Sequence, residues 1–294
     1  DRYLSSPGRR RGALHNPTGL PARRVTQEDP RPNTVTTRSV GASPLPSGSL
    51  ELPHRPKGSI KVPTTIATLN IRHGGSRTSA ALATRLRSYD ADILVVSEFR
   101  TNAAGAQLIA RLKDVGYDVS HPGVGPKDNA VLIAARGGID RSWAFSESLD
   151  PRHLWCAEID GICVCGVYMP QKMAKLPYWE TLVCGARDAG IDLLIGDFNT
   201  GNNDLDKDPR GAKFIGPEMP GRLVAQGYTD VWRSLHPGVR EYSWFSRPGD
   251  NGFRLDYIFA VADLAEKIQY CEFDHAPRNL GETDHSGLVA VMDD

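Results

Sequence analysis

The sequence predicts an α/β fold in which a mixed β-sheet is layered against helices. Short apolar, β-branched runs that are typical of buried strands alternate along the chain with segments of helical period. Two such runs, Trp155–Ile159 and Ile162–Tyr168, flank Asp160-Gly161, which is a hairpin signal and requires antiparallel neighbours in the sheet. A length of 294 residues, of which 40% are hydrophobic, is enough for a large core.

The first 62 residues differ in composition from the rest of the chain. They are rich in Pro, Arg, Ser, Thr and Gly, show no helical or strand period, and hold 11 Lys/Arg against 4 Asp/Glu. We therefore expect a disordered tail at residues 1–62, followed by one domain at residues 63–294. The basic tail is either a solvated segment or an arm for nucleic acid, whereas the acidic remainder suits a site where carboxylates hold a cation.

Strands and helices follow one another from Pro63 onward. Each predicted strand is a run of apolar residues, and each predicted helix has apolar residues three or four positions apart, as Leu82 and Leu86 are in the first helix. Besides the hairpin, the predicted strands are Thr65–Leu69, Ile93–Val96, Ala130–Ala134, Ile191–Ile195, Leu255–Val261 and Gly287–Met292. The predicted helices are Ser79–Ser88, Ala103–Val115 and Tyr178–Ala189, and the predicted long loop is Asn202–Pro220.

Five short polar motifs stand beside these apolar runs. A sheet that brings the ends of its strands together would gather four acids, two asparagines and a histidine from them. Such a cluster suits a hard divalent cation and a phosphate ester. The motifs are Thr68-Leu69-Asn70, Ser97-Glu98, Gly196-Asp197-Phe198-Asn199, Arg254-Leu255-Asp256-Tyr257 and Thr283-Asp284-His285-Ser286.

The chemistry of each side chain predicts a role. Glu98 is the best candidate for a direct Mg²⁺ ligand, because Mg²⁺ takes oxygen ligands. Asp197 can orient and deprotonate a water, and Asn199 can bind a phosphate oxygen from the same side of an extended segment. Asp256 is the acid expected to hold His285, whose imidazole would donate to the phosphate.

Other chemistries lack their motifs. The sequence contains no nucleophile elbow, no P-loop and no Cys-x-x-Cys pair. An odd count of five cysteines argues against a disulfide framework, and no apolar run approaches the roughly 20 residues of a membrane span. No signal peptide is visible, which favours the cytoplasm.

The motifs resemble the endonuclease/exonuclease/phosphatase superfamily over residues 65–292. The motifs at residues 196–199 and 283–286 are specific when they occur in this order. The resemblance implies a four-layer α/β sandwich of two packed mixed sheets flanked by helices, and a hydrolase of phosphate esters that depends on Mg²⁺ or Mn²⁺. It assigns Asn70, Glu98 and Asp284 to the metal, Asp197 to the attacking water, Asn199 to the phosphate, and Asp256 to His285.

Within this superfamily the chain is most similar to exonuclease III and the abasic-site endonucleases. Tyr168-Met169-Pro170-Gln171 resembles their motif, in which the tyrosine contacts the scissile phosphate, so we expect a catalytic Tyr168 and a substrate-binding Gln171. Phe253 and Trp244 resemble aromatic residues that wall a pocket for an extruded sugar. Arg72 stands where these enzymes carry an acid and is assigned to the substrate, and Phe99-Arg100 after Glu98 is a second departure. The chain is therefore expected to be a divergent member.

The sequence thus predicts a metal-dependent DNA endonuclease or exonuclease that hydrolyses phosphodiester bonds with an activated water. We expect DNA as the partner, a monomer, no membrane, and a role in DNA repair. A phosphatase or phosphodiesterase for a small or lipid substrate is an alternative that the acidic domain favours. The absence of a start methionine before Met169 leaves open the endonuclease portion of a mobile-element protein. A binding module without catalysis is a further alternative.

Overall fold

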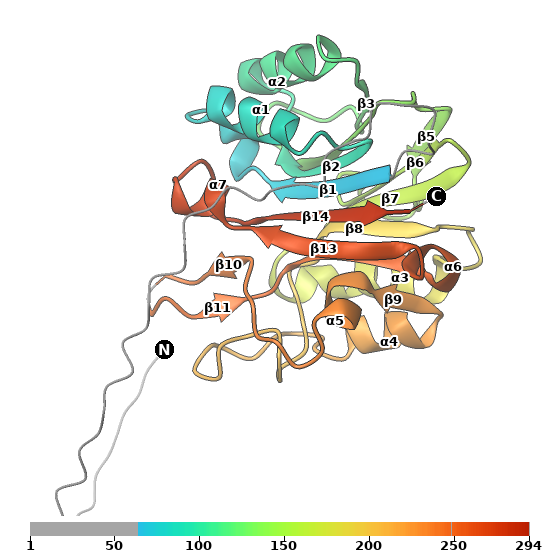
Figure 1. Cartoon of the computed structure of the whole chain (residues 1–294), viewed down its shortest axis with the longest axis vertical. Coiled ribbons are helices and arrows are strands. Elements are labelled where there is room, and N and C mark those ends of the chain that lie inside the picture. The colour runs from blue at the N-terminus through green and yellow to red at the C-terminus, as the bar shows by residue number, and fades with distance from the viewer. Residues whose placement is uncertain (1–63, 248, 294) are drawn as a thin grey trace, which may run out of the picture. The chain divides into compact units, whose positions relative to one another are not determined.

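The computed structural model describes residues 64–247 and 249–293, and the predicted tail lies outside these residues. Two six-stranded mixed sheets pack face to face, with helices on their outer faces (Figure 1). The predicted four-layer α/β sandwich is therefore confirmed. Among the described residues, no helix is both long and apolar enough to cross a membrane.

The first sheet brings together strands that lie far apart in the sequence. Its first strand pairs in parallel with the second, placing Asn70 opposite Ser97, and pairs antiparallel with the last strand of the chain. In spatial order, the strands are β13 (Ile268–Asp274), β14 (Gly287–Met292), β1 (Thr64–Asn70), β2 (Ile93–Phe99), β4 (Ala130–Ala135) and β3 (Asp118–Ser120).

The second sheet places three predicted site residues side by side. Tyr168 is opposite Asp197 in one strand pair, and Asp197 is opposite Asp256 in the next. In spatial order, the strands are β5 (Arg141–Ala144), β6 (Leu154–Ile159), β7 (Ile162–Tyr168), β8 (Leu193–Asp197), β12 (Asp256–Val261) and β9 (Tyr228–Asp230). A separate hairpin consists of β10 (Trp244–Phe245) and β11 (Gly252–Phe253).

The helices cover the outer faces of the two sheets. Buried residues such as Leu82 and Leu108 pack α1 and α2 on the first sheet, and Trp179 and Leu223 pack α3 and α4 on the second. The longer helices are α1 (Ser79–Ser88), α2 (Ala103–Lys113), α3 (Leu176–Gly185) and α4 (Met219–Ala225). The short elements are η1 (His73–Gly75), η2 (Lys172–Lys175), α5 (Val231–Leu235), α6 (Ala262–Ala265) and α7 (Ala276–Asn279).

The central core lies between the sheets and leaves little free space. At Gly166 on β7, an added Cβ would lie 2.5 Å from Val131 Cγ1 of β4, so a larger residue would push the sheets apart. Val95, Ile133 and Ile195 are fully buried in the same cluster. Tight packing of this kind holds the ends of both sheets in a fixed relation, which a site shared between the sheets requires.

Some predicted boundaries differ from the observed ones. The helix predicted at Tyr178–Ala189 runs from Leu176 to Gly185, because Pro177 fits the first turn of a helix, where no amide donor is needed. The predicted loop Asn202–Pro220 is largely irregular, but its last two residues begin α4. The sequence analysis missed the strands β3, β5, β9 and β13, the hairpin of β10 and β11, and the helices α4 to α7.

Candidate active site

The predicted site residues meet at one end of the sandwich, where strands of both sheets finish or begin. Asn70 and Glu98 come from the ends of β1 and β2, and Asp197 ends β8. Asp256 begins β12, and His285 lies two residues before β14. Residues separated by more than 200 positions in the sequence are therefore brought together by strand pairing.

Asn70 links the carboxylates of the two sheets. Its Nδ2 donates to Asp197 Oδ2 at 2.8 Å and to Glu98 Oε1 at 3.2 Å. Its side-chain oxygen accepts from the Arg72 backbone N–H at 2.9 Å, which orients the amide. All of Asn70 is buried. Its position therefore fixes the separation between Glu98 and Asp197.

Glu98 faces the cavity with its second oxygen held by separate donors. Oε2 accepts from the His73 backbone N–H at 2.7 Å and from Asn129 Nδ2 at 3.0 Å. The same Asn129 amide group lies 3.1 Å from the Tyr168 hydroxyl, and Arg100 Nε donates to its oxygen at 2.6 Å. Asn129 thereby connects the Glu98 side of the site with Tyr168.

The Asp197–Asn199 segment is a turn rather than an extended strand. Asn199 has a left-handed φ of 49°, and its backbone N–H donates to Asp197 Oδ1 at 2.9 Å. Its Nδ2 donates to the Met169 carbonyl at 2.8 Å and lies 3.3 Å from Asp197 Oδ2. The expected extended geometry was wrong, because this Asx turn reverses the chain, yet the two side chains still meet. At Gly196, φ is 140° and an added Cβ would lie 2.0 Å from the Val167 carbonyl oxygen, so only glycine fits.

His285 and Asp256 form the predicted buried pair. His285 Nδ1 lies 2.8 Å from Asp256 Oδ2. Burial lowers the pKa of His285, but the negative charges of Asp256, Asp197 and Asp284 outweigh burial and raise this pKa to about 10. The imidazole is therefore cationic at neutral pH. Asp256 Oδ1 is buried and has no hydrogen-bond partner among the described residues.

Asp197 is a nearly inaccessible carboxylate beside this pair. Its exposed fraction is 1%. Burial and the charge of Asp256 raise the pKa of Asp197 to about 7, although the His285 charge and the Asn199 hydrogen bond act in the opposite direction. A carboxylate with this pKa can accept a proton near neutral pH.

A cavity of about 410 Å³ opens onto these groups. Three predicted residues, Asn70, Tyr168 and Asp256, do not line it and lie behind its wall. Burial raises the pKa of Tyr168 well above its usual range, so its hydroxyl stays protonated. The predicted residues that line the cavity are Arg72, Glu98, Gln171, Asp197, Asn199, Trp244, Phe253, Asp284 and His285.

Two groupings of side chains could hold a metal ion. Atoms of Asp197, Asp256 and His285 that could act as ligands all lie within 4.8 Å of one another. The raised pKa of His285 favours its charged form, which does not bind a cation, so this grouping would need the neutral imidazole. Glu98 and Asp284 offer oxygens to the same cavity, although Asp284 also pairs with Arg72 Nε at 3.4 Å. The carboxylate oxygens of Glu98 and Asp284 are hard ligands that suit Mg²⁺ or Mn²⁺.

The sequence analysis missed several polar residues of the site, among them His73, Lys175 and Asn129. Lys175 on η2 is buried in the cavity wall, and its Nζ donates to the Asn199 carbonyl. Burial lowers the pKa of Lys175 to about 8, although Asp197 raises it. Asn129 directly precedes β4 and carries no motif. A lysine a few residues after Tyr168-Met169-Pro170-Gln171 was the available signal for Lys175, whereas nothing in the sequence pointed to Asn129.

Other motif residues anchor the strands that carry the site. Arg254 is buried, and it donates to Asp206 Oδ1 at 2.8 Å and to Asp230 Oδ1 at 2.9 Å. Thr283 Oγ1 donates to the Asn70 carbonyl at 2.8 Å. The last motif of the chain is therefore hydrogen-bonded directly to the first. The Arg-Leu-Asp-Tyr motif is anchored by the ion pairs of Arg254 with Asp206 and Asp230.

Two packed mixed sheets, with buried carboxylates and a histidine at one end of the sandwich, are typical of a class of enzymes that hydrolyse phosphate esters. Residues 67–276 match the model of the endonuclease/exonuclease/phosphatase family, and the chain belongs to that family.

Several solved structures share this fold. The chain is 26% identical to an AP endonuclease from Archaeoglobus fulgidus, with a TM-score of 0.69 over 79% of this chain and 100% of that one. It is 24% identical to a 3′ phosphatase from Neisseria, with a TM-score of 0.69 over 78% and 99% of the two chains. An AP endonuclease from Leishmania major is 18% identical, with a TM-score of 0.62 over 79% and 88%. Low identity to all three is consistent with the predicted divergence.

Proposed function

We propose that this protein is a divalent-metal-dependent DNA phosphodiesterase, in which a water activated by Asp197 attacks the phosphorus of a phosphodiester bond. The observation that carries the proposal is the raised pKa and fixed orientation of Asp197 beside the charged His285–Asp256 pair. A base and a cationic hydrogen-bond donor stand together at a cavity large enough for a nucleotide phosphate.

In this mechanism the residues around the cavity divide the work. Asp197 takes a proton from the water, and Asn70 and Asn199 hold its carboxylate toward the cavity. His285 donates to a phosphate oxygen, with its charge maintained by Asp256. Asn199 and Tyr168 are assigned to the phosphate, Asn199 from the cavity wall and Tyr168 from just behind it. Lys175 adds positive charge on the Asp197 side.

The metal is assigned to Glu98 and Asp284, with Asn70 positioning Glu98. When bound there, Mg²⁺ or Mn²⁺ would neutralise phosphate charge and stabilise the transition state. Glu98 already has donors on both oxygens, so its carboxylate is oriented before any cation arrives.

A DNA substrate is supported by the family and by similar proteins. The Neisseria 3′ phosphatase was solved with a product DNA hairpin, and the Archaeoglobus protein is named an AP endonuclease. Arg72, Gln171, Trp244 and Phe253 line the cavity and are assigned to the substrate, the aromatic pair as walls for a sugar. An enzyme that acts on abasic sites would serve DNA repair.

The substrate assignment is tested with five substrates: plain duplex DNA, duplex DNA with one abasic site, duplex DNA with a 3′-phosphate, single-stranded DNA and a small chromogenic phosphodiester. Each is incubated with Mg²⁺, Mn²⁺ or EDTA. We expect metal-dependent cleavage of DNA, strongest at the abasic site. Release of phosphate only from the 3′-phosphate end would make the protein a phosphatase. Hydrolysis of the small ester alone would contradict a DNA substrate. No hydrolysis of any of the five substrates would favour a binding module without catalysis.

The metal assignment makes a separate prediction. Glu98→Gln removes the carboxylate charge and should raise the Mg²⁺ concentration for half-maximal activity at least about tenfold, which corresponds to about 1.4 kcal/mol of binding. The exposed Glu147→Gln is the matched control and should leave the titration unchanged. If Glu98→Gln titrated like the wild type, Glu98 would not be the ligand.

A further inference from the structure

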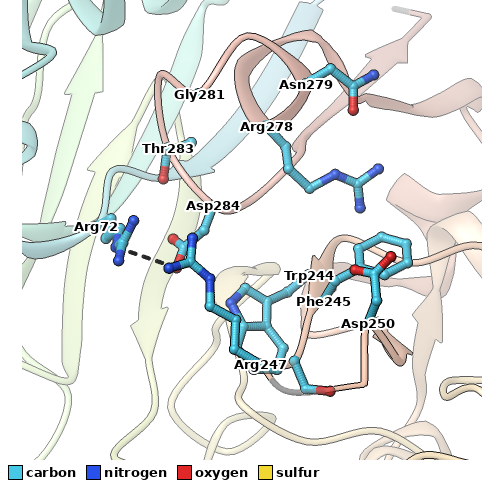
Figure 2. A pocket seen from close by; sticks show the side chains of 11 residues that line it. Arg72, Trp244, Phe245, Arg247, Asp250, Arg278, Asn279, Gly281, Thr283 and Asp284 are labelled. Carbon is cyan, nitrogen blue, oxygen red and sulfur yellow. Dashed lines mark ion pairs between the residues drawn. The ribbon is translucent and has the colours of Figure 1, made fainter.

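A second cavity, of about 790 Å³, adjoins the active-site cavity and shares Arg72, Trp244 and Asp284 with it. We call it the arginine pocket, after Arg72, Arg247 and Arg278 in its lining (Figure 2). Because the two cavities share lining residues, a polymeric ligand bound in one cavity can extend into the other.

The three arginines reach this pocket from separate parts of the chain. Arg72 follows β1, Arg247 lies in the turn between β10 and β11, and Arg278 belongs to α7. Figure 2 shows the Arg278 side chain extending toward Phe245. The Arg278 guanidinium carbon lies 4.3 Å from the centre of the Phe245 ring, and Nη1 donates to the Tyr242 carbonyl at 3.2 Å. The guanidinium of Arg278 is therefore held in place before any ligand binds.

The three arginines differ in whether they form an ion pair with an acidic side chain. Arg72 pairs with Asp284. Within residues 64–247 and 249–293, neither Arg247 nor Arg278 forms an ion pair, although Asp250 lies in the same lining. Two guanidinium groups at this pocket thus keep donors available for an anion, and guanidinium matches a phosphate with paired hydrogen bonds.

We propose that the arginine pocket binds a phosphodiester group of the same DNA strand, next to the one that is hydrolysed. This inference rests on the proposed function, and it deepens it, because a small ester would fill only the active-site cavity. Trp244 stands at the boundary between the two cavities, where its ring offers a surface for the intervening sugar or base. The pocket would therefore select a polynucleotide over a small phosphate ester.

Binding is measured without catalysis, by the fluorescence anisotropy of a labelled DNA duplex in EDTA. The variants are Arg247→Gln, Arg278→Gln and the double variant, with exposed Arg111→Gln on α2 as a control for the charge change of a single variant. We expect the double variant to bind about tenfold more weakly and the control to bind within about twofold of the wild type. The slope of log Kd against log salt should fall by about 0.9 for each DNA phosphate that the variant no longer neutralises.

Hydrolysis of the small chromogenic phosphodiester separates this inference from the proposed function. DNA binding that depends on the two arginines, with small-ester turnover unchanged in the double variant, supports the pocket. If DNA were bound in this way but never cleaved, the pocket would stand and the phosphodiesterase proposal would fail. The pocket would be overturned if the double variant bound DNA as tightly as the wild type. It would also be overturned if Arg111→Gln weakened binding as much as the double variant does, or if the wild type did not bind DNA. Arg247 is exposed, so its single variant gives a result even if Arg278→Gln unfolds.

Discussion

Lys175 places a positive charge beside Asp197 in the wall of the active-site cavity. Its ammonium group bonds to the Asn199 carbonyl and lies close enough to Asp197 for the two charges to interact. Because the lysine is buried, its pKa is lowered to about 8, within the range in which activity can be measured. The lysine therefore offers a test of whether charge at this point contributes to phosphate binding.

We expect kcat/KM to fall as the pH rises through about 8, since the cationic form of Lys175 is present below its pKa and is lost above it. Lys175→Arg keeps the charge and should shift this fall in kcat/KM to higher pH. Lys175→Met should lower kcat/KM about tenfold below pH 8 and abolish the fall near pH 8. The measurement is a pH profile with the small phosphodiester. If the fall in kcat/KM stayed at the same pH in Lys175→Arg, it would report the titration of another group.

Residues with their own motif could be predicted, and residues that depend on distant neighbours could not. Asp256 and His285 were paired from the sequence because each belongs to a motif of the resembled superfamily, and the pair is observed at 2.8 Å. Asn129 contacts Glu98 and Tyr168, which come from two other strands, so nothing beside it in the sequence marks it. Metal and catalytic roles for the site residues stay predictions.

At the level of elements, the start of β12 is held by a buried charge network. Asp206 Oδ1 accepts from both Arg254 and Arg233 at 2.8 Å, and Asp206 Oδ2 lies 3.2 Å from the Tyr257 hydroxyl. Opposite charges hold the pKa of Asp206 below its usual value despite its burial. The network therefore fixes the strand that carries Asp256.

Asp206→Ala leaves the buried Arg254 without one of its two carboxylates. We expect a loss of about 3–5 kcal/mol in the free energy of unfolding, because the remaining charge is uncompensated in the interior. Asp208→Ala removes a carboxylate only two residues away, whose partner Arg210 is exposed, and should change the free energy of unfolding far less. Urea unfolding compares the two variants. Equal losses would mean that the buried network contributes no special stability.

Buried central strands were predictable, and edge strands were not. β2, β4, β8 and β14 are wholly buried runs, which the apolar pattern marks directly. β13, at the edge of its sheet, mixes exposed Gln269 and half-buried Glu272 with apolar residues. Only pairing with β14 makes this segment a strand, and no local pattern encodes that pairing.

At the scale of the whole molecule, the two sheets and the end of the sandwich that carries the site lie within residues 64–293. The predicted tail at residues 1–62, the monomeric state and the cytoplasmic location stay predictions. The basic composition of residues 1–62 is compatible with a solvated segment or with an arm for nucleic acid.

Deleting residues 1–62 should leave the folded domain and its chemistry intact, because the core and the cavity are formed by later residues. The melting temperature and small-ester kcat/KM of residues 63–294 are compared with those of the full chain. We expect both to be unchanged, while affinity for DNA falls if the tail contacts phosphates. Loss of folding would show that the tail belongs to the domain.

The central claim is that a water activated by Asp197 attacks phosphorus. Its most direct test is cleavage of a duplex with one abasic site in H₂¹⁸O with Mg²⁺, read by mass spectrometry for the wild type and Asp197→Asn. We predict one ¹⁸O on the phosphate of the wild-type product and a rate at least about 10²-fold lower for Asp197→Asn, which should remain folded. A product phosphate without ¹⁸O, or Asp197→Asn cleaving at the wild-type rate, would contradict the account.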